Sequence, residues 1–316
     1  MRWAWLAVAA ATVCSCSTDG PLPASSSLAY EVVVTGEGDS TLCALLSTDT
    51  EGLPQREPLF DVSEHPGADY AASELRLARS IVDVDIDAYI YNKVEMKWRT
   101  NVYARPQIVV SLTAPSQRLL DEYIAKNGHK IVALLSRFER RVAMARLEKE
   151  DNPRARSLIR EMFGVEMKVP ARMLSSKKGK GFVWLSDNAA SAMTNICVFW
   201  GSNIDSTLAA NIKGEHPEMQ MRIVRGTVGR SIGDSLTVSR GLWEMEGDAM
   251  GGPFVAHTVR TGNDSLTALA FVYAPGRSKR NLLRDLESAL FTLRIGVRNE
   301  TVGGKRIVPQ TVETNL

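Results

Sequence analysis

The sequence predicts an α+β fold, in which a mostly antiparallel sheet is covered by helices packed on it. Three observations predict it: segments in which apolar and charged residues alternate, a long helical region mid-chain, and an amphipathic segment near the C-terminus. The chain has 316 residues, of which 44% are hydrophobic and 23% charged, as in average soluble globular proteins. This length fits one large domain or two medium ones.

The first half begins with a β-branched run at residues 30–34 (YEVVV), which predicts a strand. Asp39 or Ser40 can cap a short helix over residues 41–47. A further strand is expected at residues 107–112, where Ala114-Pro115 ends it.

Two segments alternate apolar and charged residues with period two, residues 81–87 and 94–102. This period is typical of half-buried strands with one solvated face. We expect the two to pair as antiparallel neighbours with Asp85 opposite Lys97. The three aspartates on residues 83–87 could hold calcium, but a solvated sheet face is the favoured interpretation.

Between residues 116 and 162 apolar residues recur at steps of three and four, which predicts helices. Gly128 and Pro153 are expected to divide this region into three. The second half again contains strands, followed by an amphipathic helix at residues 278–294; the strands are expected at residues 163–169, 182–185, 196–200, 254–259 and 266–273.

The two halves of the chain echo each other. Residues 110–124 and 270–290 both read as a strand, an Ala-Pro dipeptide and a helix that opens on a Leu-Leu pair. Two related halves, residues 29–150 and 151–296, would explain this, and so would chance, because proline is common between strands and helices. We therefore expect an α+β domain over residues 29–296, with a helical insert between the halves, and a polar tail at 297–316.

The N-terminus has the features of a lipoprotein signal. Arg2 precedes an apolar stretch over residues 3–13, too short for a bilayer, which needs about 20 residues. Val13-Cys14-Ser15-Cys16 places an aliphatic residue three positions before Cys16 and a small one just before it. We expect residues 1–15 to be a signal peptide and Cys16 to carry diacylglycerol and palmitate. An ordinary secretory signal is the alternative.

The predicted lipoprotein signal implies both a cellular location and a membrane partner. Residues 16–28 are small and polar and are expected to form a flexible tether. The lipid would hold the chain to a bacterial membrane, the outer one in preference to the inner, with the domain in the periplasm or at the cell surface. With 38 basic and 36 acidic residues, the chain lacks the charge of a nucleic-acid binder.

Two further cysteines, Cys43 and Cys197, lie in apolar surroundings. The favoured interpretation is two free buried thiols, and the alternative is a disulfide, which export permits. The sequence contains no catalytic, metal-binding or phosphate-binding motif, so we expect no cofactor and no metal. Gly36-Glu37-Gly38 lacks the third glycine of a dinucleotide loop and is interpreted as a tight turn.

The segment from residue 240 to 254 is the most unusual one. It holds an aromatic residue, several charges and a Gly-Gly-Pro turn, in which left-handed backbone is expected at Gly251 or Gly252. Either a binding groove or a tightly packed strand pair would fit. The candidate ligand-binding residues are Arg240, Trp243, Glu244, Asp248, Met250, Gly251 and Gly252.

The sequence resembles an uncharacterised lipoprotein family of Bacteroidetes-type bacteria, domain of unknown function 4837. The similarity rests on Cys16, on residues 53–60 (LPQREPLF), 104–107 (ARPQ) and 182–185 (FVWL), and above all on the RGLW and MGGPF motifs at residues 240–254. The resemblance implies an envelope lipoprotein and assigns no activity.

Two functions follow from these observations. The first is a lipid-anchored envelope protein that is not an enzyme and binds a ligand or an envelope protein through its second half. The alternative is a hydrolase of a polymer or peptide, in which carboxylates such as Glu57, Glu244 and Asp248 act as acid and base.

Overall fold

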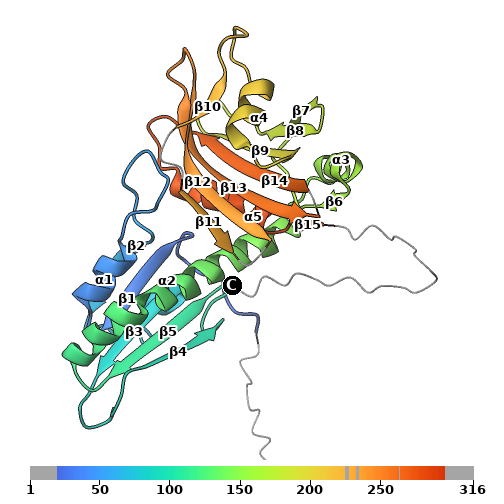
Figure 1. The fold of residues 1–316 in the computed structure, drawn as a ribbon. Helices are drawn as coiled ribbons and strands as arrows, with labels where there is room; N and C mark the ends of the chain where they lie inside the picture. Colours follow the sequence, from blue (N-terminus) through green and yellow to red (C-terminus); the bar gives the residue numbers. More distant parts are fainter. Residues whose placement is uncertain (1–19, 225–227, 233–234, 263, 296–316) are drawn as a thin grey trace, which may run out of the picture.

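The computed structural model describes residues 20–224, 228–232, 235–262 and 264–295. They form two lobes, shown in Figure 1, each built on its own sheet. We call residues 20–148 the N-terminal lobe and residues 149–295 the C-terminal lobe. Helices and strands together make the predicted α+β fold, which is thereby confirmed. The predicted signal peptide, Cys16 and the tail at 297–316 lie outside the described residues.

The N-terminal lobe contains a five-stranded sheet in the order β2-β1-β3-β5-β4. Its strands are β1 (Glu31–Gly36), β2 (Asp61–Pro66), β3 (Ser80–Ile86), β4 (Glu95–Thr100) and β5 (Ile108–Ala114). A short 3-10 helix, η1 (Glu74–Leu77), precedes β3. The first three strands and β5 run parallel, and β4 is the antiparallel edge.

The predicted pairing of the two alternating segments is wrong. Both are strands of one sheet, but β5 lies between β3 and β4, so Asp85 lies opposite Thr113 and Lys97 opposite Ser111. The physical reason is burial: β5 is apolar on both faces and takes an interior place, whereas β4 carries charges suited to a solvated edge.

Helices α1 (Ser40–Leu46) and α2 (Gln117–Leu147) pack on this sheet, and α3 (Pro153–Phe163) follows α2 and packs on the C-terminal lobe. Asp39 caps α1, as predicted, by accepting a hydrogen bond from the Leu42 amide at 2.7 Å. The predicted break at Gly128 is wrong, because α2 is continuous. A Cβ at Gly128 would lie 2.4 Å from a methyl of Leu45, so this glycine lets α1 pack closely against α2.

The C-terminal lobe contains an antiparallel sheet in the order β10-β12-β13-β14-β9-β8-β7, with β11 also paired to β12. The strands are β7 (Ser175–Gly179), β8 (Phe182–Ser186), β9 (Met193–Trp200), β10 (Met221–Ile223), β11 (Val228–Ile232), β12 (Leu236–Met245), β13 (Gly251–Thr261) and β14 (Asp264–Tyr273). Strands β6 (Val165–Glu166) and β15 (Arg294–Ile295) form a separate pair.

Both faces of the large sheet bury a core. One core includes Leu286 of α5 (Arg280–Leu290) and Ile159 of α3. The core on the other face includes Leu208 of α4 (Ile204–Asn211), together with Trp243 and Phe271. Because both faces are covered, the central strands β9 and β14 are almost continuously buried.

The echo between the halves is local. The unit of strand, Ala-Pro and helix recurs as β5–α2 and as β14–α5. The sheets around it differ, however, since β5 has one parallel and one antiparallel neighbour and both neighbours of β14 are antiparallel. The likeness of the halves therefore does not extend beyond this unit.

The N-terminal segment is attached to the lobe over part of the predicted tether. The Arg105 amide donates to the Pro23 carbonyl at 2.8 Å, and the Ser26 amide donates to the Leu77 carbonyl at 2.9 Å. The prediction of a free tether is therefore wrong for residues 23–26, because backbone hydrogen bonds hold them. Within the described part of the chain, no helix has the length and apolar composition that crossing a membrane requires.

Candidate functional site

The segment singled out by its glycines forms the β12–β13 strand pair. Trp243 is only 2% exposed, and its Nε1 donates to the Val272 carbonyl at 3.3 Å. Its ring meets Phe271 edge-on, with 5.2 Å between centroids. Neither Gly251 nor Gly252 has left-handed backbone, so that expectation is wrong. A Cβ at Gly252 would lie 2.0 Å from the Val272 carbonyl oxygen, so the strands can approach only because this residue is glycine.

The charged candidate residues of this segment and Met250 differ in the sheet face they occupy and in their exposure. Residues alternate along β12, so Arg240 and Glu244 lie on the α5 face and Trp243 on the other. Glu244 and Asp248 are exposed, the latter in the turn before β13, while Met250 is half-buried against the core that holds Trp243. These side chains do not share one face of the sheet.

The three carboxylates of the hydrolase alternative have separate roles. Both oxygens of Glu57 accept backbone hydrogen bonds at the start of α5, from the Lys279 amide at 2.8 Å and the Arg280 amide at 2.9 Å. Glu57 therefore caps this helix from the other lobe. Glu244 and Asp248 lie on a strand and in a turn, as described above.

Both remaining cysteines are free, so the described structure contains no bridge between them. Cys43 is half-buried in α1 of the N-terminal lobe, and Cys197 is fully buried in β9 of the C-terminal lobe. Burial raises the pKa of the Cys43 thiol to about 11, with the Glu64 and Asp39 charges adding to it. This thiol is therefore a poor nucleophile at neutral pH.

Two ion pairs hold α5, one to β2 across the lobe boundary and one to β12 within the C-terminal lobe. Arg280 of α5 bonds Asp61 of β2 at 2.5 Å, and Arg240 of β12 forms an ion pair with Glu287 of α5. Burial by itself raises the pKa of Glu287, but Arg240 and the hydrogen bond from His257 outweigh it and hold this pKa at about 2. The Arg280–Asp61 pair therefore holds α5 to β2, and the Arg240–Glu287 pair holds β12 to α5.

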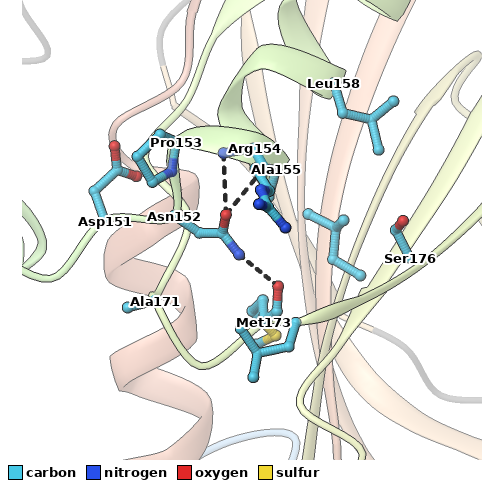
Figure 2. A pocket seen from close by; sticks show the side chains of 11 residues that line it. Asp151, Asn152, Pro153, Arg154, Ala155, Leu158, Ala171, Met173 and Ser176 are labelled. Atoms are coloured by element: carbon cyan, nitrogen blue, oxygen red, sulfur yellow. Dashed lines mark hydrogen bonds between the residues drawn. The ribbon is translucent and has the colours of Figure 1, made fainter.

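One hollow of about 660 Å³ lies at the start of α3 (Figure 2). The Asn152 side-chain oxygen accepts from the Arg154 and Ala155 amides, and its Nδ2 donates to the Met173 carbonyl at 2.7 Å. Asp151 bonds Arg156 and the Val169 amide. The Asp151 and Asn152 side chains are therefore both engaged by groups of the protein, and much of the remaining lining is apolar.

A larger hollow of about 820 Å³ lies between the edge strand β4 and the C-terminal half of α2. We call it the β4–α2 groove. Figure 1 shows these two elements along one side of the N-terminal lobe. Trp98 of β4, 53% exposed, lies at its edge. Its lining includes Trp98, Arg105, Arg137, Phe138, Arg141, Val142 and Lys149.

Helix α2 places cations and apolar side chains beside each other in this groove. Phe138 and Val142 are four residues apart, and so are Arg137 and Arg141, so each pair follows the helix surface. Like charges four residues apart destabilise a helix by about 0.2–0.5 kcal/mol. Neither Arg137 nor Arg141 forms an ion pair with a described carboxylate, so this repulsion is not relieved within the described structure.

The loop that carries Arg105 is held by Gln107, which is fully buried. The Gln107 side-chain oxygen accepts from the Tyr103 amide at 2.8 Å, and its nitrogen donates to the Arg76 and Ala78 carbonyls at 2.6 and 2.7 Å. These bonds tie the loop to the segment before β3. Arg105 is therefore presented from a fixed backbone.

Most cations of the groove have no ion pair among the described residues. Of its lining cations, Arg105, Arg137, Arg141 and Lys149 have no described carboxylate within ion-pair distance. Arg146, which also lines the groove, is paired with Asp285 and with Glu150, the one carboxylate among the lining residues. The Nε of Arg137 is buried without a hydrogen-bond partner in the described structure. Burial, and then the charges of Arg137 and Arg141, lower the pKa of the adjacent Arg140. The groove therefore combines apolar side chains with five cations and one carboxylate, and four of the five cations have no ion pair among the described residues.

Sequence reasoning missed this groove. The arginines of α2 and the ARPQ motif are both visible in the sequence, but their juxtaposition depends on β5 placing β4 at the edge. Among the described residues no group of His, Cys, Asp and Glu is arranged to hold a metal ion. Asp83 and Asp85 are instead bonded to Thr35 and Tyr91.

Two family models match the chain. Residues 30–148 match a domain of unknown function (DUF8532), and residues 152–292 match a domain of unknown function (DUF4837). The resemblance inferred from sequence is therefore confirmed at the level of uncharacterised domains, and the second model covers only the C-terminal lobe. No curated protein matches the chain. Neither description assigns an activity.

Proposed function

We propose that this protein is a lipid-anchored component of the cell envelope that binds an anionic ligand in the β4–α2 groove. The observation that carries the proposal is that four cations of that groove, Arg105, Arg137, Arg141 and Lys149, have no ion pair among the described residues. Arginines held together on an apolar floor repel one another, and a bound anion removes this cost.

The anchor follows from the sequence pattern before Cys16. Attachment of the lipid would leave the lobes in the envelope, where the unsatisfied arginines meet phosphate- and carboxylate-bearing molecules. Binding is preferred to hydrolysis because Glu57 uses both oxygens to cap α5, which removes one of the three candidate carboxylates from catalysis.

The anchor is tested by labelling cells with an alkyne analogue of palmitate. The parent chain and a Cys14→Ser variant should incorporate the label and fractionate with membranes. A Cys16→Ser variant should incorporate none. Equal labelling of the Cys16→Ser variant would contradict the anchor.

Anion binding is tested with tripolyphosphate as the probe and the melting temperature as the readout. A ligand that binds only the folded state raises the melting temperature. The increase should be lost in Arg137→Gln/Arg141→Gln and kept in Lys178→Gln/Lys180→Gln, which removes two exposed charges from β7 and its turn. Equal stabilisation of all three proteins would contradict a specific anion site.

A further inference from the structure

The N-terminal segment reaches the lobe beside the β4–α2 groove. Residue Ala24 forms a β-bridge with Arg105, and Arg105 itself lines the groove. The hydrogen bond from the Arg105 amide to the Pro23 carbonyl, 2.8 Å long, fixes this junction. The chain that precedes Pro23 therefore leaves the N-terminal lobe beside Arg105, so an anchor on that part of the chain would hold the lobe from this side.

Chain length limits how far a lipid on Cys16 can lie from this point. Seven residue steps separate Cys16 from Pro23. A fully extended chain spans at most about 3.6 Å per residue, so the distance is at most about 25 Å. A bilayer that holds Cys16 therefore lies within reach of the Arg105 side of the lobe.

The exposed side chains around this junction suit a bilayer surface. Trp98 is 53% exposed at the groove, and Leu22, next to Pro23 in the N-terminal segment, is 40% exposed. Tryptophan favours the headgroup level of a membrane, where its ring is partly apolar and its N–H is solvated. Arginine binds phosphate with paired N–H donors.

We propose that the β4–α2 groove docks onto the anionic headgroups of the membrane that anchors the chain. This inference rests on the proposed function, because it names the occupant of the same groove. The cations Arg105, Arg137, Arg141 and Lys149 contact lipid phosphates, and Trp98 lies among the headgroups. The lipid on Cys16 and the groove then attach the same side of the protein to the membrane. Each attachment strengthens the other, because it keeps the second binding element close to the membrane surface.

The test uses the chain from residue 17 to 316, which carries no lipid. Every hydrogen bond and core contact described above lies within residues 20–295, so this chain retains them. Its binding to vesicles is measured by sedimentation, with equal parts of phosphatidylglycerol and phosphatidylcholine, or with phosphatidylcholine alone. The parent should bind the anionic vesicles and not the neutral ones.

The groove variant and its control distinguish docking through the groove from non-specific attraction of positive charge to the vesicles. A cation near an anionic surface contributes about 1 kcal/mol, so Arg137→Gln/Arg141→Gln should bind about 30-fold more weakly. The control Lys178→Gln/Lys180→Gln loses the same charge from exposed positions in the other lobe and should bind within about twofold of the parent. Equal loss in both variants would overturn the proposal.

A second variant covers the case in which the double arginine variant does not fold. Trp98 lies on an edge strand and is half exposed, so Trp98→Gln is expected to fold and to weaken vesicle binding severalfold. Unchanged vesicle binding in Trp98→Gln would count against the proposal. Stabilisation by tripolyphosphate without any vesicle binding would overturn membrane docking and leave the anion-binding function standing. Failure of both would remove the groove as a site.

Discussion

Two arginine-rich regions of this molecule differ in what surrounds their guanidinium groups. At the junction between the lobes, Arg280 bonds Asp61 and Arg240 bonds Glu287, and each arginine holds one element against another. In the β4–α2 groove, Arg137 and Arg141 have no carboxylate partner in the described structure. Carboxylates thus neutralise Arg280 and Arg240, whereas Arg137 and Arg141 have no such partner among the described residues.

The difference indicates how to separate structural from binding arginines. A charge that is buried with its partner stabilises the fold only as part of the pair, so removing one member leaves the other uncompensated. A charge without an internal partner contributes little to folding, and its removal affects what binds from outside. Replacing an arginine should therefore lower the stability of the fold in the first region and weaken ligand binding in the second.

The largest effect is expected for Arg240→Ala. Glu287 is only 7% exposed and would lose its guanidinium partner, so unfolding should become easier by about 3–5 kcal/mol. Arg240→Lys retains the charge and serves as the control, with a smaller loss. Melting and urea unfolding measure both, and an Arg240→Ala protein as stable as the parent would contradict the structural role.

The same pair predicts a dependence of stability on pH. The pKa of Glu287 is about 2 in the folded protein, below the unfolded value of about 4.3. Its stabilising contribution is therefore present above about pH 5 and is lost as the pH falls from there toward 2. Urea unfolding across this range should show a shallower acid loss in Glu287→Gln than in the parent. Identical slopes would be inconsistent with this pKa.

A smaller effect is expected for Gln107→Leu, which connects the scaffold to the groove. The substitution leaves the Arg76 and Ala78 carbonyls and the Tyr103 amide without their side-chain partner. The Ala78 bond is buried, and leaving its carbonyl unpaired costs about 1–3 kcal/mol; the Arg76 and Tyr103 bonds are part-buried and add less, so the expected total is about 2–4 kcal/mol. Because the loop positions Arg105, vesicle binding should weaken as well. Unchanged melting would show that these bonds do not hold the loop.

The smallest effect on stability is expected for Arg141→Ala. This side chain has no ion pair among the described residues, and its removal relieves repulsion with Arg137. The free energy of unfolding should therefore change by less than about 0.5 kcal/mol. A loss comparable to that of Arg240→Ala would erase the distinction between the two regions.

Local chemistry made much of the fold predictable. Asp39 caps α1 because a short acceptor precedes an apolar-periodic segment, and Asn152-Pro153 begins α3 in the same way. Period two located β3 and β4 but could not assign their neighbours. That choice depended on which strand could be buried on both faces, and β5 comes later in the chain.

The candidate site was less predictable for a related reason. The segment around Trp243 and Gly252 has an unusual composition, which suggested a binding site. In the structure, Gly252 allows β13 to approach β14 closely, and Trp243 packs in the core. The arginines of α2 look in sequence like an ordinary solvated helix face. Their role emerges only when Trp98 and Arg105 are brought alongside them.

The most direct test of the account measures where Trp98 lies when the protein meets a membrane. The chain from residue 17 to 316 is mixed with phosphatidylglycerol vesicles whose acyl chains are brominated just below the headgroups, and tryptophan fluorescence is compared between the parent and Trp98→Phe. Bromine quenches only tryptophans close to it. If the groove docks onto the membrane, the parent should be quenched and Trp98→Phe should not. Equal quenching in both proteins, or none in the parent, would contradict docking through the β4–α2 groove.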